Sequence, residues 1–401
     1  MSTIKNTLLE ILSICIDELR HIFKDGGVML LLFGATLVYP LIYSLAYHPE
    51  VLRDAPIAVI DNSNSQISRE LTRMIDASAE VNVDYKLTSL REAEKLFYKG
   101  DIAGIIAIPE SFLENISSGE QAYLSVYADA SYMMLYKQVY TASATASQTL
   151  GKKIEIKKRM MQGTPKEAAI KQSSPIQFEA RSLFNPIGGY STYAMPAILV
   201  LILQQTLLLG IGMRGGTARE LGAKHFLLPT MASGEGGLRI IFGKTLAYSI
   251  LYIPISFYLF VVVFSWFDFP MAGNITHLFM LMIPLILASI MLGLVFTTLF
   301  RNRENSMIFL LFTSVPLIFL SGFSWPIESF PAGFQFLANL FPSTPGIIGV
   351  LKISIMGGNW QTAMPQIAQL WLMAVVFFII NWIIVRVKIS QTKKELPVKM
   401  S

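Results

Sequence analysis

The sequence contains little of what reactive sites and soluble surfaces are made of. Its 401 residues include one cysteine and four histidines, and only 15% of them are charged. A single cysteine, Cys15, excludes an intramolecular disulfide and a cysteine-based zinc site. Soluble domains carry about 25% charged residues, whereas 53% of this chain is apolar and its mean hydropathy is +0.51. The composition therefore predicts a membrane protein.

Motifs of catalytic sites are missing as well. The histidines lie far apart, and neither His-Glu-x-x-His nor Gly-x-Ser-x-Gly occurs, so a metalloprotease or a serine hydrolase has little support. Gly243-Lys244-Thr245 resembles the end of a P-loop, but Leu238 stands where that pattern requires glycine. We expect no catalytic residue, cofactor or metal ion in this chain. Any ATP hydrolysis, with its Mg²⁺, would belong to a partner subunit.

Six apolar segments are long enough to cross a bilayer, which takes about 20 residues of helix. They are 28–47, 190–213, 245–267, 276–300, 306–322 and 366–385. None has Asp, Glu, Lys or Arg in its apolar interior, where Gln204, Gln205 and Asn381 are the main strongly polar side chains. Ion-coupled transporters need titratable or coordinating groups at this depth. The spans therefore argue against a transporter with its own energy source.

Lysine and arginine in short loops predict the orientation of the spans. Fifteen lie on the side of the two termini, in 1–27, 214–244, 301–305 and the basic tail 386–401, and one, Lys352, lies on the other side. We expect both termini in the cytoplasm and segment 48–189 outside it. Basic charge placed in this way is a topology signal, and it gives no reason to expect nucleic acid as a partner.

The segment before the first span predicts an amphipathic helix over 4–24. Glu10, Asp17, Arg20, His21 and Lys24 share the polar face. A helix lying in the lipid headgroup layer is the favoured interpretation, and a surface for a cytoplasmic partner is compatible with it. The opposite stripe consists of Ile4, Leu8, Ile11, Leu12, Cys15, Leu19, Ile22 and Phe23.

The large segment 48–189 has an α/β rhythm. Strand patterns at 57–60, 81–85, 102–108 and 123–127 alternate with helical ones, which predicts a small parallel or mixed sheet. A long helix is expected over 131–162. Basic residues near its end favour a solvated face, although an anionic ligand, a lipid or nucleic acid would also suit them.

Two further segments carry candidate functional residues. In 217–228, Thr217 with Glu220 three residues later resembles a capping box, so we expect a short cytoplasmic helix that transmits force from a motor; a plain linker is the alternative. Its candidate coupling residues are Thr217, Arg219, Glu220, Leu221, Lys224 and His225.

In 323–364, short apolar stretches between prolines predict re-entrant half-helices at the outer mouth, with a plain loop as the alternative. The candidate gate residues are Gly322, Pro326, Pro331, Pro342 and Pro345.

Several strings, in this order along the chain, point to a known family. They are Ile57–Asp61 with the following 65–69, Gly104–Phe112, Phe184-Asn185-Pro186 at the entry to the second span, Gly243-Lys244 at the third, and Ser321-Gly322 through Pro331 to Pro342-Ser343-Thr344. One span, a large insert, then five spans with a proline-rich segment resembles the ABC-2-type permeases, in particular the drug-efflux branch with a large periplasmic domain. The family usually has acidic residues before the Gly-Thr of the cytoplasmic loop; here Met213-Arg-Gly-Gly-Thr217 lacks them.

The resemblance implies a polytopic α-helical membrane protein with an inserted α/β extracytoplasmic domain. It implies the permease subunit of an exporter in the bacterial inner membrane. The apolar, uncharged spans themselves favour a lipophilic or amphiphilic substrate, drug-like or lipid-like. The partners that the resemblance suggests are a separate ABC ATPase subunit, a second permease chain, a periplasmic membrane-fusion adaptor and membrane lipids. The alternative is a membrane receptor whose outer domain binds a ligand, but the cytoplasmic segments are short for an output domain.

Overall fold

The computed structural model describes residues 2–176, 179–221, 236–300 and 302–395. The chain divides into two compact units. The α/β unit comprises Val51–Arg181, and the membrane unit comprises Met1–Glu50 together with Ser182–Ser401. The α/β unit is shorter than the expected segment 48–189, because the residues on either side of it pack with the start of the second span.

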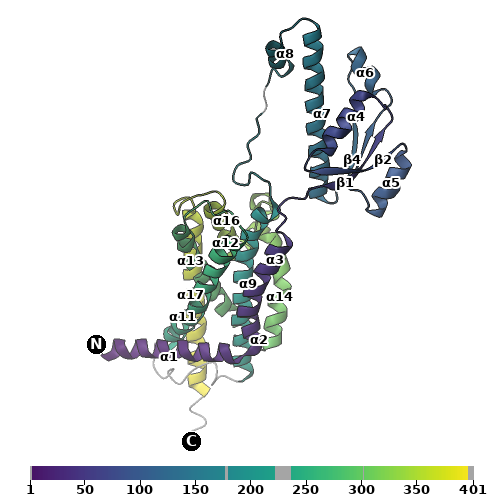
Figure 1. Cartoon of the computed structure of the whole chain (residues 1–401). Coiled ribbons are helices and arrows are strands. Elements are labelled where there is room, and N and C mark those ends of the chain that lie inside the picture. Colours follow the sequence, from purple (N-terminus) through teal and green to yellow (C-terminus); the bar gives the residue numbers. More distant parts are fainter. Residues whose placement is uncertain (1, 177–178, 222–235, 301, 396–401) are drawn as a thin grey trace. The chain divides into compact units, whose positions relative to one another are not determined.

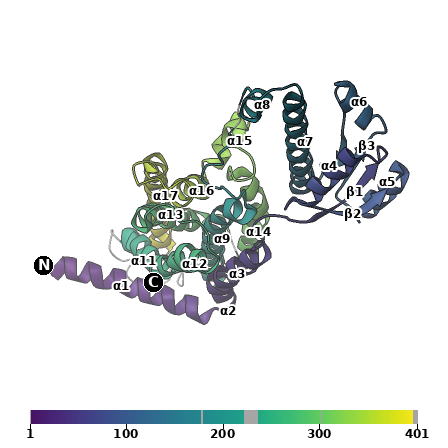
Figure 2. The same cartoon turned by 45° about the horizontal axis from the view of Figure 1, so that its top comes forward.

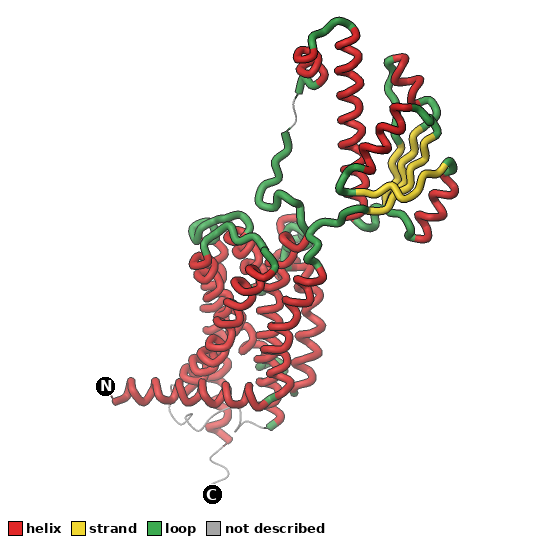
Figure 3. Tube along the Cα trace, viewed as in Figure 1, coloured by secondary structure: helices red, strands yellow, loops and turns green. Residues whose placement is uncertain are grey.

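The α/β unit contains all the strands that the described residues form (Figure 3). The sheet order is β2-β1-β3-β4, with β1 parallel to β2 and β3, and β4 antiparallel to β3. Parallel neighbours need long crossovers, and helices between the strands supply them. The strands are β1 (Ala55–Asp61), β2 (Val81–Leu87), β3 (Gly104–Ile108) and β4 (Ser125–Ala128), and the helices are α4 (Gln66–Asp76), α5 (Leu90–Lys99), α6 (Phe112–Ser118), α7 (Met133–Met161) and α8 (Lys166–Ser173).

The two faces of this sheet bury separate apolar clusters. Ile57 and Ile106 pack with Leu71 of α4 and with side chains of α7 on one face. Ala58 and residues of α5 form the smaller cluster on the other face. Because successive residues of a strand point to opposite faces, the continuous apolar run of β1 supplies both clusters.

Among the described residues, six helices of the membrane unit are long and apolar enough to cross a membrane, and they correspond to the six predicted spans. They are Gly26–Ala46, Tyr190–Glu220, Gly236–Trp266, Ile275–Phe296, Arg303–Leu320 and Met364–Val387. The corresponding elements are α2 (Gly26–Met29), η1 (Leu30–Ala35), α3 (Thr36–Ala46), α9 (Tyr190–Glu220), α11 (Gly236–Phe257), η3 (Tyr258–Val262), α12 (Val263–Trp266), α13 (Ile275–Phe296), α14 (Arg303–Leu320) and α17 (Met364–Glu395). Helix α1 (Ser2–Lys24) precedes them and lies across one end of the bundle, called here the α1 end (Figure 1).

The spans differ sharply in how far the rest of the unit covers them. In α9, 83% of the apolar window is buried, whereas the value is 17% in α14. Figure 2 shows α9 among α3, α13 and α14. Helix α9 is therefore the central helix of the bundle, whereas α14 lies at its periphery with most of its apolar surface exposed.

A bent helix pair follows α14. After η4 (Ile327–Ser329), α15 (Ala332–Ala338) and α16 (Ser343–Ser354) meet at 79°, which fits a broken span or a re-entrant loop. Helix α16 is buried, and its glycines allow close packing: a Cβ at Gly349 would lie 2.7 Å from Leu281 of α13. Segment 323–364 therefore contains two short helices, and their re-entrant position at the outer mouth stays a prediction.

Candidate functional site

Helix α1 packs tightly against α11. The approach depends on Gly243 of α11, because a Cβ there would lie 2.6 Å from Cγ2 of Ile14. Three of the buried side chains on this face are apolar, and the fourth is a carboxylate. The four are Ile14, Cys15, Glu18 and Ile22.

The predicted apolar stripe of α1 is divided between two environments. Cys15 and Ile22 face the bundle, whereas Leu8, Leu12 and Phe23 are exposed. An exposed apolar arc beside a charged face is typical of a helix lying in the headgroup layer. The interfacial position of α1 stays a prediction, with this arc as its structural basis.

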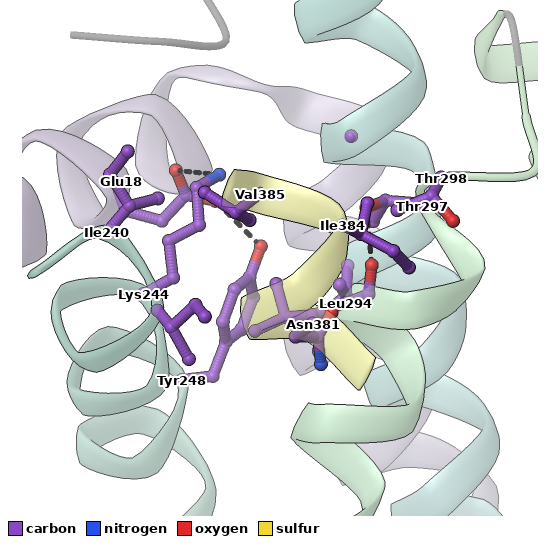
Figure 4. Close-up of a pocket in the computed structure, with 13 residues that line it drawn as sticks. Glu18, Ile240, Lys244, Tyr248, Leu294, Thr297, Thr298, Asn381, Ile384 and Val385 are labelled. Carbon is purple, nitrogen blue, oxygen red and sulfur yellow. Dashed lines mark hydrogen bonds and ion pairs between the residues drawn. The ribbon is translucent and has the colours of Figure 1, made fainter. Parts of the chain in front are cut away.

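Glu18 joins α1 to two spans, and its bonds to one of them, α11, can be followed in Figure 4. Its Oε2 accepts a hydrogen bond from Nζ of Lys244 at 3.1 Å, and its Oε1 accepts one from the hydroxyl of Tyr248 at 2.9 Å; both partners belong to α11. Nε of Arg214, on α9, lies 4.0 Å from Oε1. We call Glu18, Arg214, Lys244 and Tyr248 the charged cluster.

The charged cluster keeps Glu18 ionised although its side chain is only 6% exposed. Burial raises the pKa of Glu18, but the charges of Lys244 and Arg214 and the hydrogen bonds from Tyr248 and Lys244 outweigh burial, so the pKa lies below its ordinary value. A buried ion whose partner is removed is strongly unfavourable. The cluster therefore holds α1, α9 and α11 together as one interdependent group.

Two more ion pairs attach the same part of the chain to the spans. Glu10 of α1 pairs with Arg239 of α11. Asp25, between α1 and α2, accepts hydrogen bonds from both terminal nitrogens of Arg303 on α14, at 2.7 and 2.8 Å, and from two backbone N–H groups of α2 at 3.1 Å. Burial raises the pKa of Asp25, but these hydrogen bonds and the charge of Arg303 leave it lowered. Residues 10–25 are thus bonded to α9, α11 and α14.

The prediction that a separate capped helix begins at Thr217 is wrong. Helix α9 continues to Glu220, and the Thr217 hydroxyl donates to the carbonyl of Met213 at 3.0 Å, as a residue inside a helix does. The capping box therefore does not form. Arg214 and the glycines after it do not end the helix, because Gly216 packs directly against the backbone of Arg303 at the start of α14.

The other predicted coupling residues are divided by the end of α9. Arg219 donates to the carbonyls of Thr298 at 2.9 Å and Phe300 at 2.5 Å, and Glu220 accepts from the backbone N–H of Arg303 at 2.8 Å. These contacts tie the end of α9 to the connection between α13 and α14. Leu221 is the C-cap residue of α9. Lys224, His225 and the rest of 222–228 lie outside the described residues.

A cavity of about 30 Å³ adjoins the charged cluster. Thr297, the C-cap residue of α13, and Asn381 of α17 line it together with Glu18 and Lys244 (Figure 4). A cavity of this size holds about two water molecules, and drug-sized ligands need roughly 300 Å³ or more. The charged cluster therefore connects helices, and the cavity beside it is too small for a drug-sized ligand. Among the described residues, no three His, Cys, Asp or Glu side chains are placed to hold a metal ion.

The comparison with protein families agrees with this architecture. Residues 27–383 match the family model described as ABC-2 family transporter protein, which covers all six spans and the α/β unit. The chain belongs to the ABC-2 transporter family.

Three permeases are similar to this ABC-2 protein over most of their length. A linearmycin resistance permease protein of Bacillus subtilis is 24% identical over 370 residues, 87% of this chain and 92% of the relative. An inner membrane transport permease of Escherichia coli is 25% identical over 395 residues, 93% and 96% of the two chains. A probable multidrug ABC transporter permease of Escherichia coli is 21% identical over 327 residues, 81% and 84%. This chain is therefore a permease subunit of an ABC transporter.

At the far end from α1, the predicted entry to the second span closes around Asn185. Its side-chain amide donates to the carbonyl of Gly189 at 2.8 Å and accepts from the N–H of Gly189 at 3.0 Å. Phe184, just before it, has a left-handed backbone with φ of 66°, and Pro186 follows in the turn. Sequence reasoning missed Glu50, which accepts hydrogen bonds from the backbone N–H and hydroxyl of Thr192 at 3.1 and 2.9 Å and so caps α9.

The predicted gate residues mark the ends of short elements in the permease. Gly322 has a φ of 80° in the turn after α14. Pro326, Pro331 and Pro342 are the N-cap residues of η4, α15 and α16, and Pro345 lies in the first turn of α16. The structure thus gives each of them a backbone role. Whether this segment gates the path stays a prediction.

Proposed function

We propose that this permease forms the export path for lipophilic or amphiphilic compounds and is driven by a separate ATPase. Two relatives are named for linearmycin resistance and for multidrug transport, and their names support the same substrate class here. The spans support it too, because Gln204, Gln205 and Asn381 are the strongly polar side chains of their apolar interiors. The energy must then come from outside the bundle.

The α1 end is the proposed docking side of the ATPase. Displacement of α1 reaches α9 and α11 through the charged cluster and α14 through Asp25 and Arg303. Lys224 and His225 stand in the sequence between α9 and α11. A partner shifts a conformational equilibrium only by its differential affinity for the two states. Tight binding of ATP by the partner would therefore supply the energy that rocks the bundle.

The proposed setting is the bacterial inner membrane, with the α1 end and both termini in the cytoplasm. The asymmetry of fifteen basic residues against one supports this orientation. The α/β unit would then lie outside, where it receives substrate or meets an adaptor. A receptor without transport is not favoured, because the relatives that match nearly the whole chain are permeases.

Transport by the reconstituted pair tests the function. The tagged chain is purified with the ABC ATPase that accompanies it, and ATP-dependent ethidium accumulation is followed in vesicles. We expect uptake with both subunits and ATP, and none with the permease alone. Ethidium pumped uphill by the permease alone would contradict the proposal, as would a permease that retains no ATPase. Charge-reversing Lys224→Glu with His225→Glu should weaken ATPase retention.

The second permease chain is proposed to pack against α14, whose outward face carries Phe312 at 81% exposure. Cysteine cross-linking tests this contact in a Cys15→Ser background. Phe312→Cys should give a disulfide-linked dimer on mild oxidation. Leu372→Cys on α17, 63% exposed, is the matched control and should stay monomeric. Equal cross-linking of both variants, or none of Phe312→Cys, would count against this face.

A further inference from the structure

One groove of the α/β unit concentrates unpaired positive charge. It has a volume of about 440 Å³ and is lined by Arg69 and Arg73 of α4 and Lys86 of β2. None of these three makes an ion pair with a residue that the structure describes, whereas Lys153, also on this unit, pairs with Glu70 at 3.2 Å. Small-molecule sites have volumes of roughly 300–1,000 Å³. The groove therefore has the size of a ligand site and an excess of one charge.

The acidic residue in the lining does not neutralise the cations. Asp61, at the end of β1, is the one carboxylate among the lining residues, so the formal net charge is +2 (three cations and one anion). Its carboxylate accepts hydrogen bonds from the backbone N–H groups of Ser63 at 3.1 Å and Asn64 at 3.0 Å and from the hydroxyl of Ser68 at 2.7 Å. Asp61 thus holds the turn that leads into α4 and does not pair with the arginines.

The positions of the cations suit a single anionic group. Arg69 and Arg73 are one turn apart on α4, so their side chains share a face of the helix. Nη1 of Arg69 donates to the carbonyl of Asn64 at 2.7 Å, which restricts that guanidinium. Buried Val59 and Thr72 also line the groove and provide a surface for the body of a ligand. Guanidinium groups bind carboxylate and phosphate by paired hydrogen bonds.

We propose that this groove binds a small organic anion, whose carboxylate or phosphate lies between Arg69, Arg73 and Lys86. An acidic segment of a partner protein is the other conceivable source of carboxylates, but a groove of this volume fits a compact ligand better. The site lies in the α/β unit and does not depend on the ATPase. Binding can therefore be measured on the permease alone, and its failure is distinguishable from a failure of transport.

Fluorine NMR of the full-length permease in phosphatidylcholine nanodiscs tests the proposal. The probes are para-fluorobenzoate and para-fluorophenyl phosphate, and para-fluorobenzyl alcohol is the neutral control of similar shape. We expect saturable line broadening of one or both anions and not of the alcohol. The anion that broadens more identifies the preferred headgroup. Equal broadening of anions and alcohol would overturn the proposal, because the signal would then come from the lipid or from apolar surface.

Charge reversal locates the site. Arg73→Glu with Lys86→Glu should raise the Kd of the bound anion by about tenfold or more. Arg91→Glu with Lys95→Glu, two exposed positions on α5, changes the net charge equally and should leave the Kd within about twofold. An equal loss of affinity in both double variants would overturn binding in the groove, because the net charge of the unit would then explain the result. Hydrogen exchange of the unaltered protein gives a second readout: the bound anion should slow exchange in 59–73 and 81–90, and no slowing there contradicts the site.

Discussion

The α1 end and the middle of the membrane unit are joined by different chemistry. At the α1 end, carboxylates of residues 10–25 pair with basic side chains of α9, α11 and α14. Midway along α9, three consecutive residues make neutral hydrogen bonds to three other helices. Gln204 bonds with Ser343 of α16, Gln205 with Ser314 of α14, and Thr206 with Tyr252 of α11.

This difference indicates which part of the permease moves as one piece. Removing one partner of a buried ion pair costs about 3–5 kcal/mol, whereas a neutral hydrogen bond contributes about 0.5–1.5 kcal/mol. We infer that the α1 end stays assembled while the bundle changes conformation. The neutral contacts along α9 can exchange at modest cost, so they are the expected place of rearrangement.

The largest expected effect comes from Glu18→Gln, which removes the buried carboxylate that Lys244, Arg214 and Tyr248 contact. We expect the free energy of unfolding to fall by about 3–5 kcal/mol, together with ATP-dependent uptake. Thermal unfolding in detergent measures the first and vesicle uptake the second. Asp17→Asn, on the outward side of α1, is the control and should change little. An unfolding midpoint equal for Glu18→Gln and Asp17→Asn would show that the charged cluster does not hold α1.

A smaller effect is expected from Gly243→Ala, whose Cβ would meet Ile14 at 2.6 Å. Overpacking of this kind costs about 1–3 kcal/mol and should lift α1 from α11. The buried thiol of Cys15 reports this directly, because burial keeps it unreactive and raises its pKa. Maleimide should label Cys15 faster in the variant.

Gly26→Ala is the matched control for this labelling. A Cβ at Gly26 meets nothing within 4 Å, and this substitution too replaces a helical glycine by alanine. Labelling of Cys15 should therefore stay slow. Unchanged labelling in Gly243→Ala would mean that α1 and α11 tolerate a wider separation than the packing indicates.

The neutral contacts predict a smaller loss again. Gln204→Leu leaves the backbone N–H of Ser343 without its partner at 2.6 Å, and we expect a loss of about 1–3 kcal/mol, below that of Glu18→Gln. Gln369→Leu removes an exposed hydrogen bond to Asn339 and should cost less than about 1 kcal/mol. Chemical unfolding of the three variants gives the order. A Gln204→Leu loss larger than that of Glu18→Gln would reverse the comparison.

The smallest effect concerns pH. The folded pKa of Glu18 is lowered from an unfolded value of about 4.3. Its ionisation therefore stabilises the fold above that pH, and the contribution is lost as the pH falls through the folded pKa. Between about pH 5 and pH 3, the unfolding midpoint should fall more steeply in the unaltered permease than in Glu18→Gln. Parallel curves would exclude an ionised Glu18 as a source of stability.

Much of the fold was predictable, because it follows from local patterns. Apolar length alone located six spans, and alternating apolar runs located the strands of the α/β unit. The ends of the spans were not predictable in this way. Charges such as Arg214 and Arg239 were taken as loop residues, yet both lie in helices, because carboxylates remote in sequence compensate them. The helix start predicted at Thr217 was wrong because its capping pattern is a local signal. The contact of this part of α9 with the start of α14 is not visible in such a pattern.

The sequence by itself determined that the chain is a membrane protein with six long apolar segments, and where an α/β unit is inserted, since length and periodicity of apolar residues set these features. The tertiary structure alone decided that Glu18, which carries no local signal, meets Lys244, Tyr248 and Arg214. It also brought Arg69, Arg73 and Lys86 to one groove. The residues of each group come from separate segments of the sequence. They meet only after the helices and strands have packed, so no local pattern predicts their contacts.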